Sequence, residues 1–110
     1  MTTRKFPAEL RLMTFSLKVS EFSRWKILHL DGRFNAFNER DLLAALEPYR
    51  EYDRVGLDLS QTESLNLRIL QEIFKWSQKL RSSGGDFVII SPTDSVSRSI
   101  EIFLGMHRMQ

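Results

Sequence analysis

The stretch LDLSQTESLNLRIL, from Leu57 to Leu70, contains the junction that decides the fold. In its first residues, LDLS, apolar side chains alternate with polar ones. A polar segment, QTES, follows, and from there apolar residues begin to recur at helical spacing. We therefore predict a buried strand, a polar loop and the start of a helix. The junction has no glycine, and its residues at the helix start are Asn66, Leu67 and Arg68. Asn66 is predicted to cap the helix, because its side-chain oxygen can accept an early backbone N–H bond.

The helix and the strand that follow this junction have recognisable limits. Apolar residues recur at helical spacing over residues 69–80, and Gly84 and Gly85 are predicted to end the helix in left-handed conformation. The next segment, residues 86–91, is a continuous apolar run, which is typical of a strand covered on both faces. A last helix is predicted after Pro92, capped by Asp94 or Ser95 and broken by Gly105.

Two strands and a helix are predicted upstream of the junction. Residues 12–20 alternate with a period of two, and residues 25–32 follow after a brief turn, which suggests a hairpin whose second strand Gly32 ends. Asn38 is a plausible N-cap of a helix that ends near Pro48, and residues 54–60 form the next strand. The order is β-β-α-β-α-β-α. This order predicts an α/β fold with a mixed sheet of about four strands and helices packed on it.

The composition fits one ordinary globular domain. The chain has 110 residues, of which 42% are hydrophobic and 27% charged, and its net charge is only +2. This charge gives no reason to expect nucleic acid as a partner. Cysteine is absent and only two histidines occur, which argues against a metal site. The first residues lack the apolar core of a signal peptide, and no segment approaches a membrane span, so we expect a cytoplasmic protein.

The motifs of common enzyme classes are missing. There is no glycine-rich phosphate loop, no GK[ST] and no Gly-x-Ser-x-Gly. We therefore predict a protein without enzymatic activity and without a cofactor. His29 is read as a packed, hydrogen-bonded side chain, and Asp31 as a turn residue. A carboxylate pair between Asp31 and Asp58 across the sheet receives little weight. Trp76 is read as partly packed on a wet helix face whose basic residues surround it, in preference to a single-stranded nucleic acid site.

Three segments together resemble the STAS domain, the sulfate transporter and anti-sigma factor antagonist family. They are LHLDGRFNAFNERDLLAAL, VGLDLSQTESLNLRIL and LRSSGGDFVIISPTDSVSRSIEIFLGM. The resemblance covers about residues 12–106 and is to the stand-alone bacterial type. It implies a single domain over residues 12–110, preceded by a tail or an extra element over residues 1–11.

The resemblance also implies an unusual switch loop. Phosphorylatable members of the family have Asp-Ser-Ser-Gly-Leu before the second helix, and the first serine accepts the phosphate. By spacing, Asn66 takes the place of the aspartate and Leu67 that of the acceptor serine. Leu67 has no hydroxyl, so phosphorylation is not expected at the usual position. Thr62 and Ser64 are less favoured substitutes.

The function implied is that of a non-catalytic module for protein–protein interaction in signalling and transcription regulation. Its partner would be an anti-sigma factor, a related kinase or another signalling protein, and homodimerisation is also open. The alternative is an accessory subunit that joins the ATPase of an ABC-type lipid transporter. For Leu67, packing in the core and exposure at the helix tip both remain open. The residues predicted to bind the partner are Phe34, Asn35, Asn38, Ser64, Asn66, Leu67 and Arg68.

Overall fold

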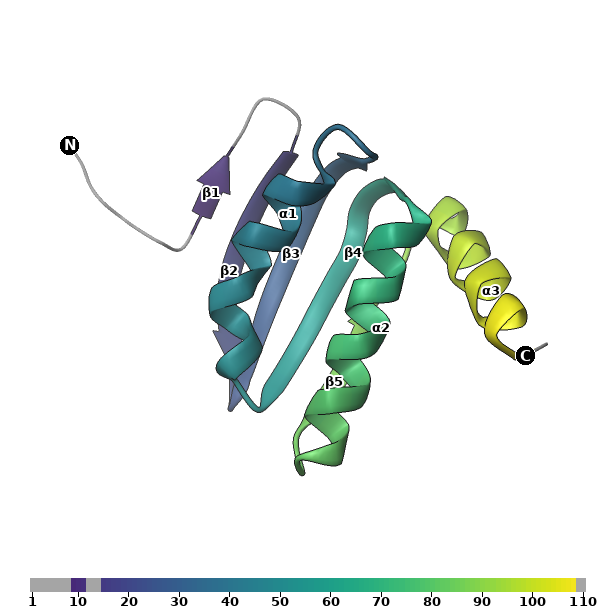
Figure 1. Cartoon of the computed structure of the whole chain (residues 1–110). Helices are drawn as coiled ribbons and strands as arrows, with labels where there is room; N and C mark the ends of the chain where they lie inside the picture. The colour runs from purple at the N-terminus through teal and green to yellow at the C-terminus, as the bar shows by residue number, and fades with distance from the viewer. Residues whose placement is uncertain (1–8, 12–14, 109–110) are drawn as a thin grey trace.

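The computed structural model describes residues 9–11 and 15–108 of the chain (Figure 1). In chain order the elements are β1 (Glu9–Arg11), β2 (Phe15–Phe22), β3 (Trp25–Phe34), α1 (Glu39–Leu46), the 3₁₀ helix η1 (Glu47–Glu51), β4 (Arg54–Leu65), α2 (Leu67–Ser82), β5 (Asp86–Ile90) and α3 (Asp94–Arg108). The predicted order β-β-α-β-α-β-α is confirmed for β2 to α3. The short strand β1 is added in front, within the segment predicted to be a tail or an extra element.

The strands form one mixed sheet in the order β1-β2-β3-β4-β5. β1, β2 and β3 pair antiparallel, whereas β3, β4 and β5 pair parallel. The parallel pairs require crossover connections, which α1 and α2 supply. The α/β fold class is therefore confirmed.

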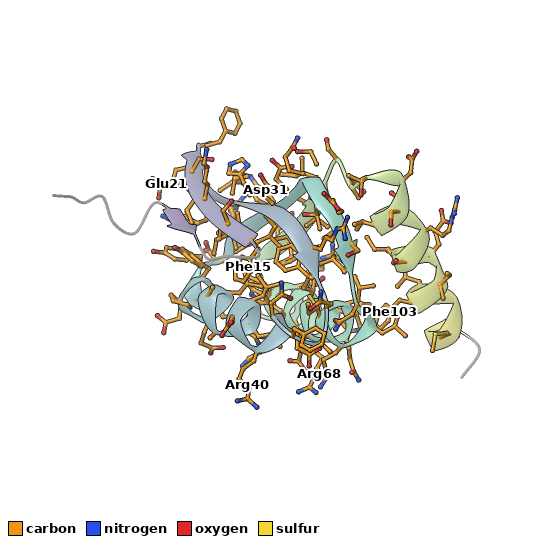
Figure 2. All side chains as sticks on the ribbon, turned by 90° about the horizontal axis from the view of Figure 1, so that it is seen from above. Phe15, Glu21, Asp31, Arg40, Arg68 and Phe103 are labelled. Atoms are coloured by element: carbon orange, nitrogen blue, oxygen red, sulfur yellow. The ribbon has the colours of Figure 1, made fainter. Side chains whose placement is uncertain are left out.

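The core lies between the sheet and two helices. Figure 2 shows α1 and α2 on the same face of the sheet. Helix α3 packs against β4 and α2 at the β5 side of the sheet. The alternation of the strands turns one set of apolar side chains toward the helices. The fully or nearly fully buried strand residues on this face include Leu17, Leu28, Leu30, Val55, Leu57, Leu59 and Phe87. Within the described part of the chain, no helix covers the opposite face of the sheet.

The two central strands are longer than predicted. β3 does not end at Gly32 but continues to Phe34, and Gly32 has a φ of 134° beside a shift in the β3–β4 register. A bulge of this kind suits a glycine because the residue has no Cβ. The polar loop predicted after Ser60 is likewise wrong, since β4 continues to Leu65. Thr62 is fully buried there, and its hydroxyl donates a 2.8 Å hydrogen bond to the Leu30 carbonyl oxygen.

Helix α2 has the predicted start and a well-defined end. The side chain of Asn66 accepts a 2.9 Å hydrogen bond from the Ile69 backbone N–H, which confirms the cap. At the other end, Gly84 has a φ of 90° and donates to the Arg81 carbonyl, while Gly85 donates to the Leu80 carbonyl. This pair of bonds is a Schellman motif, in which only the first glycine needs the left-handed conformation.

The environment of Trp76 differs from its prediction. Its side chain is buried and not partly wet, because it packs edge-to-face on Phe87 with ring centroids 5.0 Å apart. The Arg50 guanidinium lies 5.6 Å from the centroid of the Trp76 ring. The basic residues of α2 therefore do not frame an exposed aromatic ring.

The last strand and helix also depart from their predictions. β5 is an edge strand, and Val88 and Ile89 are both more than one third exposed, so it is not covered on both faces. Ile89 lines an apolar cavity of about 250 Å³ that lies between α2, β5 and α3. Helix α3 is not broken at Gly105, and its first turn is capped by Thr93, whose hydroxyl accepts a 3.4 Å bond from the Val96 N–H.

We predict that Gly85→Ala lowers the free energy of unfolding by about 1–3 kcal/mol, as is typical of overpacking. A Cβ at this position would collide with the Asp53 carbonyl oxygen and lie 2.9 Å from Leu80 Cδ1. Gly105→Ala is the matched control, since a Cβ there meets nothing within 4 Å. It should raise the stability by about 0.5–1 kcal/mol through better helix propensity. Urea unfolding measures both, and equal effects would contradict the packing at Gly85.

Candidate protein-interaction site

The predicted binding residues gather at the end of the sheet where β3 and β4 stop. Phe34 and Leu65, the last residues of these strands, are partners in the parallel register. Because parallel strands share the same direction, the segments that follow both strands start at the same edge. The loop over residues 35–38 and the first turn of α2 therefore lie at one end of the molecule (Figure 1).

Glu39 connects the N-termini of α1 and α2. One of its carboxylate oxygens accepts a 2.7 Å hydrogen bond from Asn66 Nδ2, and the other lies 4.0 Å from Arg68 Nη1. Asn66 at the same time caps α2 through its Oδ1 atom. Asn66 thus caps α2 and, through its bond to Glu39, links the N-termini of α1 and α2.

The loop before α1 is shaped by two asparagines. Asn38 immediately precedes the helix, as predicted, but its side chain makes no capping hydrogen bond to α1. Its Oδ1 atom accepts from the Asn35 N–H at 2.9 Å, and its Nδ2 atom donates to the Arg33 carbonyl at 2.8 Å. Asn35 in turn accepts from the Phe37 N–H at 2.9 Å. These bonds fold the loop back on itself and leave the Phe37 ring outside.

Two of the predicted contact residues are buried and need correction. Phe34 is 1% exposed, and its ring packs 5.2 Å from the centroid of Phe15 in the core. Asn38 is 3% exposed because its side chain is used within the loop. Neither side chain offers surface to a partner. Phe34 fixes the end of β3, and Asn38 fixes the loop.

The other predicted residues lie at or near the surface. Leu67 is 48% exposed, which decides between its two readings in favour of an apolar residue at the helix tip. Asn35 and Arg68 are exposed, whereas Ser64 and Asn66 are half-buried. The chain places all of these residues on the two adjacent segments described above.

Phe37 is a surface residue that the sequence reading missed. It is 95% exposed, the largest value among the exposed large apolar side chains of the described residues. The one feature of the sequence that could have indicated this exposure is its position: Phe37 lies three residues after Phe34, where the alternating pattern of β3 has ended. We define the apical patch as Asn35, Phe37, Leu67 and Arg68. An exposed aromatic residue and an exposed leucine on two adjoining segments are typical of a surface that a partner covers.

The nearby hydroxyl groups differ in their access to solvent. Thr62 is 0% exposed and donates its hydroxyl hydrogen to a backbone carbonyl, so a kinase cannot reach it in the folded chain. The substitute acceptor suggested at Thr62 is therefore wrong on grounds of burial. Ser64 is half-buried, and Ser60 is exposed.

Other kinds of site are not found in the described residues. No group of three or more His, Cys, Asp or Glu side chains is arranged to hold a metal ion within residues 9–11 and 15–108. Over the same residues, no helix is long and apolar enough to cross a membrane.

No protein-family model matches the sequence, and neither does any curated protein. Solved structures do match. An anti-sigma factor antagonist STAS domain from Rhodobacter sphaeroides superposes with a TM-score of 0.60 at 21% identity, covering 76% of this chain and 97% of that one. The fold is that of a STAS domain.

Two further structures have this STAS fold. A proposed anti-sigma factor antagonist from Thermotoga maritima gives a TM-score of 0.70 at 23% identity and covers 84% of this chain and 80% of that one. The anti-sigma factor antagonist SpoIIAA, in its unphosphorylated form, gives 0.64 at 11% identity, with 84% and 83% covered. At these low identities the similarities establish the fold alone, and the resemblance of the sequence to STAS domains is confirmed at the level of the fold.

Asn66→Ala should reduce the free energy of unfolding by about 1–2 kcal/mol, since the cap of α2 is lost. The bond to Glu39 is lost with it. Gln78→Ala, on the exposed face of the same helix, should stay within about 0.5 kcal/mol of the unmodified chain. Thermal and urea unfolding of both variants test this. A neutral Asn66→Ala would show that the junction does not depend on the asparagine.

Proposed function

We propose that the chain is a non-catalytic regulatory module that binds a protein partner through its apical patch, in the manner of an anti-sigma factor antagonist. The exposure of Phe37 is the observation that carries this proposal, since a fully exposed aromatic ring gains most from burial against a partner. The fold that the chain shares with two solved anti-sigma factor antagonists and one proposed antagonist supports it. We place the module in the cytoplasm, where such partners act.

Two exposed arginines lie near the apical patch. Figure 2 shows Arg40 on α1 and Arg68 on α2 pointing the same way from the helical side of the molecule. Both side chains are exposed. Charges of one sign at the rim of an interface steer association and select partners of opposite charge. We therefore expect the partner to place a carboxylate near Arg40 and an apolar pocket around Phe37.

We further propose that binding is not switched by phosphorylation at the start of α2. Leu67 has no hydroxyl, and Thr62, a neighbouring hydroxyl residue, is buried. A phosphate would add about −1.5 to −2 charges, which changes partner affinity strongly. Without an acceptor at this position, the module would bind constitutively.

Capture of the partner by the tagged chain in its native host tests the proposed surface. Phe37→Ser should weaken retention about tenfold or more, because truncating a central aromatic anchor commonly costs about 2 kcal/mol. Phe22→Ser is the matched control. Phe22 is also a highly exposed phenylalanine, but it lies on the β2–β3 hairpin at the opposite end of β3.

Loss of the partner with Phe22→Ser and retention with Phe37→Ser would refute the apical patch. The identity of the captured protein separates the two functional hypotheses. A kinase-like or anti-sigma protein supports the proposal, whereas the ATPase of an ABC-type transporter would assign the chain to the alternative, an accessory transporter subunit.

Incubation with the captured kinase and ATP should leave the intact mass of the chain unchanged. Leu67→Ser should gain one phosphate at position 67, because the substitution restores a hydroxyl at the exposed helix tip. Intact-mass spectrometry with peptide mapping measures both. A phosphate on Ser60 or Ser64 of the unmodified chain would contradict the constitutive mode of binding.

A further inference from the structure

A serine, a histidine and an aspartate form a hydrogen-bonded row on the helix-free face of the sheet. Ser20 Oγ lies 2.8 Å from His29 Nε2, and His29 Nδ1 lies 2.6 Å from Asp58 Oδ2. The three residues belong to the adjacent strands β2, β3 and β4. This row lies on the middle of the sheet and does not include any residue of the apical patch.

The strand register positions the row. His29 and Asp58 are direct partners in the parallel β3–β4 pair. On the other side, His29 is paired with Lys18 in the antiparallel β2–β3 ladder, so Ser20 is its diagonal neighbour. Diagonal positions on one face are within reach of a long side chain such as histidine. The contacts therefore follow from the backbone and do not depend on a mobile loop.

The carboxylate fixes the histidine tautomer. Asp58 Oδ1 accepts a 3.0 Å bond from the Ser60 N–H, which leaves Oδ2 for His29. Burial alone would raise the pKa of Asp58, but the hydrogen bonds from Ser60 and His29 outweigh it and lower the pKa below its ordinary value. Asp58 is thus a carboxylate that accepts from Nδ1–H. The Nε2 lone pair then accepts the Ser20 hydroxyl proton.

This is the relation of nucleophile, general base and orienting carboxylate that activates a serine. Ser20 is exposed, and the His29 side chain is 38% exposed, so a small reagent can reach both. A cavity of about 350 Å³ adjoins the His29–Asp58 end of the row and is lined by these two residues together with Lys18, Asp31 and Gln61 among others. The Lys18 ammonium on this face can stabilise a developing negative charge.

An apolar strip lies on the other side of Ser20. Ile27 is the register partner of Ser20, and Gly56 on β4 lies beside Ile27. A Cβ on Gly56 would lie 2.9 Å from the Cδ1 atoms of both Ile27 and Ile90, which means that these side chains close over the glycine. Val88, also on this face, is 37% exposed. The strip offers an apolar surface for a short acyl chain next to the serine.

We propose that Ser20 is an acyl acceptor, with His29 as general base, Asp58 as the positioning residue, and a short-chain activated ester or thioester as donor. As Ser20 Oγ bonds to the acyl carbon, its proton passes to His29 Nε2. The bond from the acyl carbon to the leaving oxygen or sulfur then breaks, and His29 returns the proton to that atom. The expected product is an acyl ester on Ser20 of the chain.

The test uses the full chain and p-nitrophenyl acetate, with acid quenching and peptide mapping of the acetylated residues. We expect an acetyl ester on Ser20 in the unmodified chain. This result does not depend on whether a substituted chain folds. His29→Gln should slow its formation at least tenfold, since a positioned general base contributes about 10²–10⁴-fold. Ser20→Ala should abolish the ester and the matching release of p-nitrophenolate.

Ser82→Ala is the control and should leave acetylation of Ser20 unchanged. Ser82 is an exposed serine whose hydroxyl donates to the Lys79 carbonyl and not to an imidazole. Acetylation confined to lysines and the N-terminus would overturn the proposal and leave the row as a structural link between three strands. An equal rate of Ser20 acetylation in His29→Gln would also overturn it. Neither result bears on partner binding by the apical patch.

Discussion

The parallel pairing of β3 with β4 is the interaction on which the rest of the structure depends. It runs from Val55 to Leu65 on β4, and it brings the ends of both strands to the same edge of the sheet. The loop before α1 and the first turn of α2 adjoin each other for this reason. The same pairing aligns His29 with Asp58 on the helix-free face of the sheet. Both the apical patch and the His29–Asp58 contact of the polar row therefore follow from this one register.

Buried polar groups maintain this pairing where the sequence is least apolar. The second half of β4 is rich in hydroxyl, amide and carboxylate side chains, yet it stays in the sheet. Thr62 stabilises it by bonding to the Leu30 carbonyl, and its own carbonyl accepts from Thr93 at 2.7 Å. A buried hydroxyl that is satisfied in this way costs little, whereas an unsatisfied one would cost about 1–3 kcal/mol. These bonds connect β3, β4 and the start of α3.

Features that depend on local chemistry could be predicted from the sequence. The cap at Asn66, the helix end at Gly84 and the order of the elements all follow from propensity and periodicity over a few residues. The extension of β4 through Thr62 could not, because polar residues become strand only through pairing with β3.

The surface features were harder to predict for the same reason. Phe34 and Phe37 are the same residue type three positions apart, and only the end of β3 decides that one is buried and the other exposed. His29 and Asp58 are 29 residues apart in sequence, so their contact is visible only once the strand register is known. The sequence alone leaves Leu67 open between core and surface, because its exposure depends on where the first turn of α2 lies relative to the sheet.

Hydrogen–deuterium exchange of the chain with and without its captured partner tests the central claim most directly, since it reports the contact surface without any substitution. The account predicts that amide exchange slows in residues 35–39 and 66–69, at the tips of α1 and α2, and stays unchanged along β5. Protection confined to β5 and α3, with free exchange at both helix tips, would contradict it.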